Sequence, residues 1–441
     1  MNPTRHLSFG SLRHALSSLF QHLPDPRQPG KVDYALHDAL MSGFACMFFQ
    51  DPSLLQFQQR LEEEKHRNNL HTLFGIHDTP ESTQMRELID QVDSHHFRPI
   101  LPTYFSRLQR GKHLEQFELF PGLHLCPIDG TQYFSSQHIH CPNCLTTTHG
   151  NGTTTYSHKV IQAGIMHPDH RQVMPLMPEE ISNRDGGTKQ DCEVNAAKRL
   201  LPKIRQDYPD LGLVIAGDSL FSKQPFLSDV GSANMHYIFV AKPTDHICMM
   251  TWLDTYGVSR MPGKHMVDEK GHQHIYTWLN DVPLNGHKDT LRVNYLDYRI
   301  IFREKDGNES ILYHNSWVTD IIITHKNVEL LSRAGRCRWK VENECFNTLK
   351  NQGYHIEHNY GHGSNHLCLN FYLLTLLAFY VHQVFELTDG LYQACRQKFG
   401  SKPHMWETLR SYIKILVFDT WDHLLDFAYT PSKYALSFHP P

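Results

Sequence analysis

Residues 211–220 read LGLVIAGDSL, an apolar run that ends abruptly at an acidic residue. A short apolar run bounded by turn residues is typical of a strand buried inside a sheet. The run stops at Gly217, and Asp218 follows it directly. In α/β folds, ligand sites lie beyond the carboxyl ends of the strands. The stretch therefore predicts an α/β core with Asp218 at its functional edge.

A second aspartate has the same context. The strand-like run 117–128 leads directly to Asp129, which Gly130 follows. Two carboxylates at the carboxyl ends of sheet strands could converge on one metal ion. Aspartate is also common in turns, so either residue alone has a purely structural explanation.

A third carboxylate is suggested by helical periodicity in residues 338–350, RWKVENECFNTLK. At about 100° per residue, Glu342 falls in the middle of the apolar face and Glu344 on the polar side. We therefore expect Glu342 to point into the protein and Glu344 into water. A buried glutamate is costly unless it is paired or bound to metal, and a salt bridge to Arg338 explains the pattern equally well. The apolar face consists of Trp339, Val341, Cys345, Phe346 and Leu349.

The order of these segments resembles a known enzyme family. IDGT (128–131), VIAGDSLF (214–221) and RWKVENECFNTLK (338–350), with a β-rich stretch between the last two, resemble DDE transposases of bacterial insertion sequences. The branch in question carries a Tyr-Arg-Glu-Lys signature around its catalytic glutamate. The resemblance covers residues 120–385 and implies an α/β fold with an RNase H-like catalytic core and a β-rich insertion.

Carried over to this chain, the family's catalytic and metal-binding residues are Asp129, Asp218 and Glu342. A tryptophan three residues before the glutamate is usual in the family, as Trp339 is here, and Arg338 matches the signature arginine.

Two positions depart from the signature. The tyrosine position falls on Gly335, and the lysine position falls on Leu349, one residue before Lys350. The shift puts the role of Lys350 in doubt and leaves Glu344 as a fallback for the catalytic glutamate, whereas the wheel and Trp339 favour Glu342.

The pattern of runs along the chain predicts helices at both ends and a β-rich insertion in a central core. The alternating runs HYIFVAK, HIYTWL, LRVNYLDYRIIF and SILYHNSWVT carry the β-rich part. The expected parts are an N-terminal helical domain (1–115), a first core segment (116–234), the β-rich insertion (235–325), a second core segment (326–390) and a helical C-terminal tail (391–441). The N-terminal domain could bind DNA ends or simply pack as helices.

Composition narrows the class of protein. Hydrophobic residues make up 40% of the chain and charged residues 20%, as in a soluble globular protein. The formal net charge of −4 means that DNA contacts would come from local basic patches. The ten cysteines and the lack of an apolar leader favour a cytoplasmic, nucleoid-associated protein. The apolar run 367–385 contains Asn370 and His382, which favours a buried core helix over a membrane span.

The resemblance implies a DNA transposase that uses Mg²⁺ or Mn²⁺. Such an enzyme cleaves at the transposon ends and transfers the 3′-hydroxyl ends into target DNA. Its partners would be the terminal inverted repeats and the target, bound by a homodimer. The alternatives are a catalytically inactive DNA-binding descendant and a metal-dependent nuclease without strand transfer.

Basic residues surround the expected catalytic glutamate. Their simplest structural explanation is a solvated helix end; the functional explanation is contact with DNA phosphates, which would make binding sensitive to salt. The candidates are Arg336, Arg338, Lys340 and Lys350.

One further motif has metal-binding character. Cys141 and Cys144 have the CxxC spacing of half a zinc site, although ordinary turn cysteines fit the spacing as well. The residues that could complete a structural Zn²⁺ site are Cys126, His138, His140 and His149.

Overall fold

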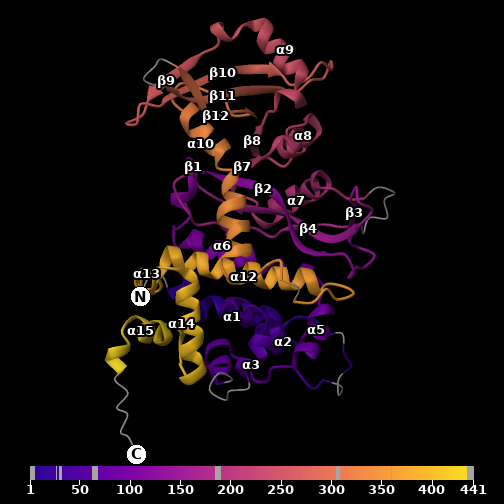
Figure 1. Ribbon diagram of the computed structural model, residues 1–441, viewed down its shortest axis with the longest axis vertical. Helices are drawn as coiled ribbons and strands as arrows, with labels where there is room; N and C mark the ends of the chain where they lie inside the picture. Colours follow the sequence, from indigo (N-terminus) through magenta and orange to yellow (C-terminus); the bar gives the residue numbers. More distant parts are fainter. Residues whose placement is uncertain are drawn as a thin grey trace, which may run out of the picture.

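The computed structural model describes residues 5–25, 27–28, 32–61, 68–183, 190–303, 308–358 and 360–434. They form a mixed α/β protein in which one 12-stranded mixed sheet is combined with helices from both ends of the chain (Figure 1). The predicted α/β class and the terminal helices are confirmed.

The centre of the sheet has five strands in the order β6-β4-β2-β7-β8. β2 is antiparallel to β4, and β4 is antiparallel to β6, whereas β2, β7 and β8 are mutually parallel. β7 is buried along nearly its whole length, which explains its continuous apolar sequence. The bounds are β2 (Leu123–Ser136), β4 (Thr154–Ile165), β6 (Glu179–Ile181), β7 (Gly212–Gly217) and β8 (His236–Val240).

Three short strands border this centre. β3 forms a hairpin with β4, β1 pairs with β2, and β5 pairs with β4. Their bounds are β1 (Glu118–Phe120), β3 (Leu145–Thr148) and β5 (Met174–Pro175).

The rest of the sheet is an antiparallel extension in the order β12-β11-β10-β9. β12 pairs with β8, so the extension continues the central sheet rather than forming a separate one. In Figure 1 it forms one end of the elongated molecule. Within the expected β-rich segment 235–325, β8 therefore belongs to the central sheet and β9 to β12 make the extension. The bounds are β9 (Gly263–Val267), β10 (Gln273–Pro283), β11 (Arg292–Arg303) and β12 (Glu309–Thr319).

Helices connect these strands. α7 follows β6 and leads to β7, α8 connects β7 to β8, and α9 precedes the extension. After β12 the chain returns through α10, the π-helix η9 and α11. The bounds are α7 (Glu193–Asp207), η6 (Ser219–Phe221), α8 (Gln224–Ser232), η7 (Pro243–Asp245), α9 (Ile247–Tyr256), η8 (Val258–Arg260), α10 (Val328–Arg336), η9 (Val341–Phe346) and α11 (Asn347–Asn351).

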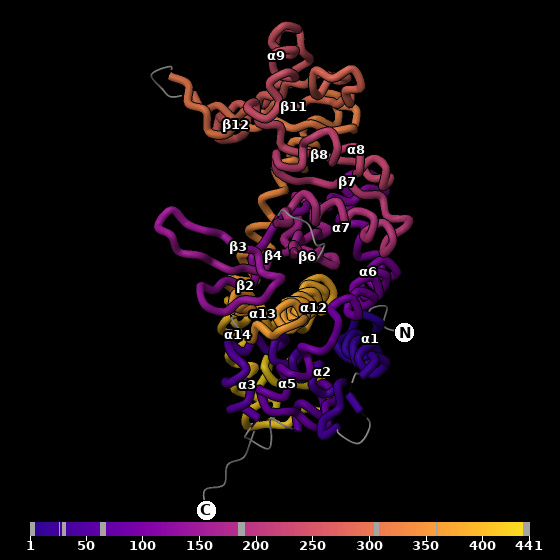
Figure 2. The backbone as a smooth tube through the Cα atoms, turned by 90° about the vertical axis from the view of Figure 1, so that its right-hand side faces the viewer, coloured from indigo at the N-terminus to yellow at the C-terminus, as the bar shows by residue number. Residues whose placement is uncertain are grey.

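The helices from the two ends of the chain pack together at the other end of the molecule (Figures 1 and 2). Asn69 donates to the carbonyls of Ile413 (3.0 Å) and Leu416 (2.6 Å), and Arg410 donates to that of Phe49 (2.7 Å). The N-terminal helices and the C-terminal tail therefore share one core. The N-terminal bounds are η1 (Arg5–Leu7), α1 (Phe9–Gln21), α2 (Leu36–Phe48), α3 (Leu54–Leu61), η2 (Leu70–Phe74), α5 (Ser82–Asp90), η3 (Ser94–Phe97), α6 (Ile100–Arg110) and η4 (Glu115–Phe117). The C-terminal bounds are α13 (Gly390–Phe399), α14 (Lys402–Ile415), α15 (Trp421–Tyr429) and η10 (Pro431–Tyr434).

α12 (Leu367–Thr388) lies between this helical layer and the sheet (Figure 1). Within the described part of the chain, it is the one helix long and apolar enough to cross a membrane, yet 89% of its most apolar window is buried. Two of its polar side chains are bonded inside the protein: Asn370 donates to the Ile89 carbonyl at 2.8 Å, and Gln383 accepts from the Val173 amide at 3.0 Å. The prediction of a buried core helix is confirmed.

Candidate active site

The two predicted aspartates belong to adjacent parallel strands: Asp129 lies within β2, and Asp218 directly follows β7. The register of β2 and β7 pairs Pro127 with Ala216. Asp129 comes two residues after Pro127, and Asp218 comes two residues after Ala216. Adjacent strands are about 4.8 Å apart, so these two residues are neighbours. β2, however, continues past Asp129 to Ser136. The expectation that Asp129 stands at a strand end is therefore wrong, whereas Asp218 does follow the end of β7.

Each aspartate is oriented by a backbone amide. Asp218 caps the short helix η6, where its Oδ1 accepts from the Leu220 amide at 2.9 Å. Oδ1 of Asp129 accepts from the Gly130 amide at 2.9 Å, and its Oδ2 lies 3.2 Å from Nη1 of Arg338. Backbone donors and one guanidinium thus hold the carboxylates in place before any ligand binds.

A third carboxylate, Glu193, joins them from the first turn of α7. A Cβ built on Gly130 would lie 2.3 Å from Oε1 of Glu193, so the glutamate fills the space that a side chain at position 130 would need. The sequence alone does not indicate this role for Glu193, because an acid in the first turn of a helix is ordinarily explained by the helix dipole. The neighbouring Asp191 pairs with Arg199 at 2.7 Å instead.

Charge crowding at this cluster changes its protonation. Burial raises the pKa of Asp129 to about 6; Arg338 opposes that rise, and the negative charges of Asp218 and Glu193 add to it. Burial and the charge of Asp218 also raise the pKa of Glu193. The charges of Asp218 and Glu193 thus disfavour the ionised form of Asp129, and carboxylate oxygens are the ligands that a hard divalent cation prefers.

Glu342 does not lie where the helical wheel placed it. The side chain is exposed, whereas Val341 and Cys345 beside it are buried. The reason is that residues 341–346 form a π-helix, whose i→i+5 hydrogen bonds give a wider turn than the 3.6-residue period of the wheel. The segment packs against β2, so Glu342 lies on the exposed side of the element that covers the strand of Asp129.

Glu344 points elsewhere. It lines a cavity that faces the C-terminal helices, and its charge acts on Lys402 of α14. Glu344 is half-buried, so the expectation that it faces water is wrong. Arg171 and Glu386 line the same cavity.

The basic residues predicted to meet DNA all have partners within the protein. Lys340 is buried, and its ammonium donates to the carbonyls of His167 (3.0 Å), Pro168 (2.8 Å) and His170 (2.7 Å). This makes Lys340 a structural residue and removes it from the candidate phosphate contacts.

The other cations are closer to the surface. Arg338 pairs with Asp129 rather than with Glu342, so the predicted salt bridge within the helix is not the one formed. The Arg336 guanidinium lies 4.4 Å from the centre of the Tyr313 ring, and Lys350 lies 2.7 Å from Glu357.

Gly335, at the signature tyrosine position, has a packing reason. A Cβ there would lie 2.5 Å from Cε2 of Trp317, a fully buried side chain of β12. No side chain fits at position 335 while that indole is present.

The CxxC motif does take part in a cluster of potential metal ligands. Cys141 and Cys144 meet His158 of β4 and His362 of the loop before α12, and the four ligand atoms all lie within 4.8 Å of one another. The expected partners lie elsewhere.

Cys126 is buried in β2, the ring of His140 stacks on Tyr156, and His149 bonds to Thr155 at 2.8 Å. His138 contributes its backbone amide to a turn with Ser136.

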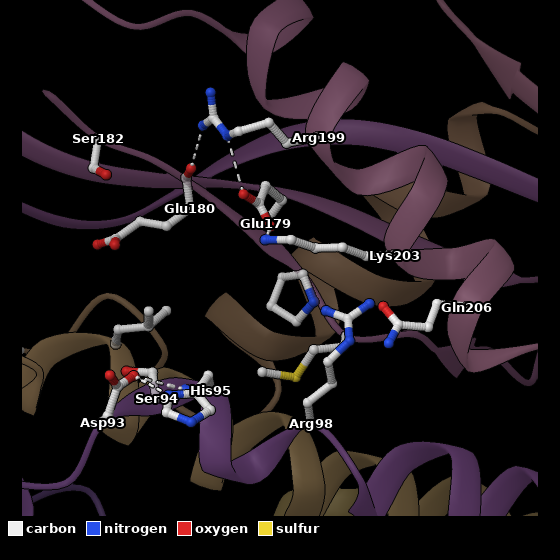
Figure 3. A pocket seen from close by; sticks show the side chains of 13 residues that line it. Asp93, Ser94, His95, Arg98, Glu179, Glu180, Ser182, Arg199, Lys203 and Gln206 are labelled. Carbon is white, nitrogen blue, oxygen red and sulfur yellow. Dashed lines mark hydrogen bonds and ion pairs between the residues drawn. The ribbon is translucent and has the colours of Figure 1, made fainter. Parts of the chain in front are cut away.

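A further cavity of about 520 Å³ lies between α7 and the N-terminal helices (Figure 3). Its two central cations, Arg199 and Lys203, both bind Glu179, at 3.0 and 2.5 Å. Arg98, which also lines it, pairs with Asp207 at 2.7 Å. Because these charges neutralise one another, the cavity is a weaker candidate site than the carboxylate cluster.

The sequence matches no model of a known protein family, and no curated protein matches it significantly. The function of this chain is therefore inferred from its own sequence and geometry.

Proposed function

We propose that this chain is a DNA transposase of the DDE type, with an RNase H-like catalytic core. The observation that carries the proposal is the meeting of Asp129, Asp218 and Glu193 beside Arg338, on adjacent parallel strands and the helix packed against them. The strand order β6-β4-β2-β7-β8, with the first two pairs antiparallel and the last two parallel, supports it as well. In an RNase H-like sheet the first aspartate lies on the first strand and the second follows the fourth. The location of Asp129 on β2 and of Asp218 directly after β7 supports the proposal.

Asp129 and Asp218 are the residues that would hold divalent metal, with Glu342 as the third acid of the triad. When bound, two such metals activate the attacking oxygen and stabilise the leaving oxygen in phosphoryl transfer. Mg²⁺ or Mn²⁺ suits an all-carboxylate donor set. Because Glu342 is exposed, it can approach DNA and metal from the solvent side while the aspartates approach from the sheet.

Two residues tune this arrangement. Arg338 lies against Asp129 and favours its ionised form, and the same guanidinium can bind a DNA phosphate beside the acids. Glu193 adds negative charge on the side of the cluster closed by α7. It thereby increases the affinity of the cluster for a cation and keeps Asp129 protonated more readily when no cation is present.

Trp339 adds a surface suited to nucleic acid. It stands beside Arg338 and is 44% exposed, which is unusual for so large an apolar side chain. Exposed aromatic rings next to basic groups stack on unpaired bases, each worth about 1–3 kcal/mol. The chemistry at DNA ends would use this ring to hold an unpaired nucleotide.

Cleavage of DNA that carries the element's two ends tests the proposal. With Mg²⁺ or Mn²⁺ the wild-type protein should cut at the ends, and Asp129→Asn and Asp218→Asn should bind the same DNA without cutting it. Cutting that persists in both variants would refute the assignment. Pre-cut ends then test joining: strand transfer supports a transposase, whereas cleavage without transfer supports a nuclease.

A further inference from the structure

We propose that Cys141, Cys144, His158 and His362 bind one structural zinc ion that fastens the β3–β4 hairpin to the loop between α11 and α12. Neither the carboxylate chemistry nor the DNA contacts proposed above use these four residues. The site lies at the base of a hairpin that extends from the body of the molecule (Figure 2).

Five of the six ligand-to-ligand distances in the cluster are close to those of a tetrahedron, and the sixth, between Cys141 and His362, is within 4.8 Å. The two Sγ atoms are 3.8 Å apart, and the two Nε2 atoms are 3.1 Å apart. The sulfur-to-nitrogen distances are 3.6 Å from Cys141 to His158, 3.3 Å from Cys144 to His158 and 3.5 Å from Cys144 to His362. With Zn–S of about 2.3 Å and Zn–N of about 2.0–2.1 Å, a regular tetrahedron requires roughly 3.8, 3.3 and 3.5 Å for S–S, N–N and S–N. The side chains thus surround a point at zinc-binding distance from all four.

The same four groups are poor partners for one another without a metal. Two imidazole Nε2 atoms 3.1 Å apart need a proton between them, and two thiols are weak donors and weak acceptors. Cys144 and His158 are buried, so water compensates little. A dication at the centre satisfies all four lone pairs at once.

The surroundings orient the ligands as a metal site requires. Nδ1 of His362 bonds to the Gly363 carbonyl at 2.7 Å, which leaves Nε2 to bind metal. Nδ1 of His158 lies 3.6 Å from the Glu180 carboxylate, on the side away from the cluster. The Cys141 amide approaches Sγ of Cys144 at 3.5 Å, a contact that favours the thiolate. Such outer partners fix ring orientation and ligand basicity in zinc sites.

Four protein ligands fill the tetrahedron, so the site is closed and structural rather than catalytic. A two-sulfur, two-nitrogen set of this shape selects zinc over Mg²⁺. The zinc ion and the cation at Asp129 would therefore occupy separate sites.

The ion would join parts of the chain that are distant in sequence. His362 comes from the segment that follows the helices carrying Glu342, whereas the cysteines lie in the turn that precedes β3. The neighbouring backbone is held from the other side by Asp90, whose carboxylate accepts from the amides of Ser364 (3.0 Å) and Leu367 (2.9 Å). Zinc and Asp90 together would fix the loop that returns the chain from the active-site face to α12.

Metal analysis of the purified full-length chain tests the proposal. After dialysis into metal-free buffer we expect one zinc per chain in the wild type and none in Cys144→Ser or His362→Ala. The matched controls Cys192→Ser, at an exposed cysteine, and His140→Ala, at a nearby histidine outside the cluster, should keep the zinc. Asp129→Asn should keep it too, which separates this site from the carboxylate cluster. A wild-type chain that retains no zinc, or a Cys144→Ser chain that retains all of it, would overturn the proposal.

Cobalt keeps the test decisive if the ligand variants fail to fold. Exchange of Co²⁺ into the wild-type protein should give the visible bands of a tetrahedral ion and a thiolate-to-cobalt charge-transfer band. An octahedral spectrum, or a Cys141–Cys144 disulfide found by alkylation and mass spectrometry in the protein as isolated, would contradict the site.

Discussion

Gly130 and Glu193 share one space: a Cβ on Gly130 would lie 2.3 Å from Oε1 of Glu193. The contact ties the first turn of α7 to β2 at the residue next to Asp129. It follows that the glycine is needed for the position of a carboxylate on another element, in addition to any need of its own backbone.

Gly130→Ala should therefore displace Glu193 and weaken cation binding at the cluster. Outer-sphere changes of this kind cost about 10–100-fold in metal affinity, and we expect a loss in that range for Mn²⁺ measured by calorimetric titration. Gly231→Ala is the matched control, because a Cβ there meets nothing within 4 Å. Unchanged Mn²⁺ affinity in Gly130→Ala would show that Glu193 plays no part in the site.

The raised pKa of Asp129 predicts how stability depends on pH. Because burial and its acidic neighbours raise the pKa from 3.8 to about 6, the folded protein binds more protons than the unfolded chain between these two values. The contribution of Asp129 to stability is present in full below pH 4 and is lost as the pH rises through 6. A bound cation stabilises the ionised carboxylate of Asp129 and so compensates for the stability lost at higher pH. The rise in Tm caused by Mn²⁺ should therefore be small at pH 5 and complete above pH 7, as measured by differential scanning calorimetry.

Asp129→Asn serves as the control for that profile. The variant should lose most of the Mn²⁺ effect and, without metal, should be less sensitive to pH between 4 and 6 than the wild type. An equal Mn²⁺ effect at pH 5 and pH 7.5 in the wild type would contradict the link between Asp129 and the cation.

Substitutions of Glu342, Glu193 and Glu344 should differ in their effect on the rate of DNA cleavage. Glu342→Gln removes the third acid of the proposed triad and should lower the rate at least about a hundredfold. Glu193→Gln should lower it less, through weaker cation binding. Glu344→Gln should leave the rate near that of the wild type, because Glu344 faces Lys402 and the C-terminal helices. Equal binding of end DNA by all three variants is the control for folding. A loss in Glu344→Gln with retention in Glu342→Gln would transfer the catalytic role to Glu344.

The acids of the candidate site differ in how well the sequence alone predicts their positions. Asp129 and Asp218 were found because each stands beside an apolar run, and that pattern is local. Glu193 was missed because the feature that places it, the missing side chain of Gly130, belongs to another element. The predicted orientation of Glu342 was wrong because residues 341–346 form a π-helix, which changes the helical period. Nothing in the residue pattern indicates that π-helix.

The Cys/His cluster and the sheet also depend on contacts between residues that are distant in the sequence. The CxxC spacing indicated Cys141 and Cys144, but His158 and His362 come from a strand and a loop that only the folded chain brings to them. Strand-forming runs were visible in the β-rich segment. β12 pairs with β8 and so extends the central sheet. No local run of residues predicts this long-range pairing.

Alanine substitutions at Arg338 and Lys340 should affect different properties, DNA binding in the first case and folding stability in the second. Arg338 is partly exposed beside the acids, so Arg338→Ala should weaken DNA binding and reduce the slope of log K against log salt by about one. Lys340 is buried among three carbonyls, so Lys340→Ala should leave the slope unchanged and lower the free energy of unfolding by about 1–3 kcal/mol. Fluorescence anisotropy at several salt concentrations and urea unfolding measure the two effects. A reduced slope in Lys340→Ala would restore that lysine to the DNA interface.

Packing between Gly335 and Trp317 should make the tyrosine of the family signature intolerable in this chain. A Cβ at position 335 would meet the indole at 2.5 Å, and Trp317 is fully buried in β12, so neither group can move without disturbing the core. Gly335→Ala should cost about 1–3 kcal/mol of unfolding free energy, the usual cost of overpacking, and Gly335→Tyr should fail to fold. Trp317→Phe removes the atoms that clash, so the double variant Gly335→Ala/Trp317→Phe should be more stable than the sum of the single changes predicts. Gly390→Ala, where a Cβ meets nothing within 4 Å, is the control. Strict additivity in urea unfolding would mean that the indole is not what excludes a side chain at position 335.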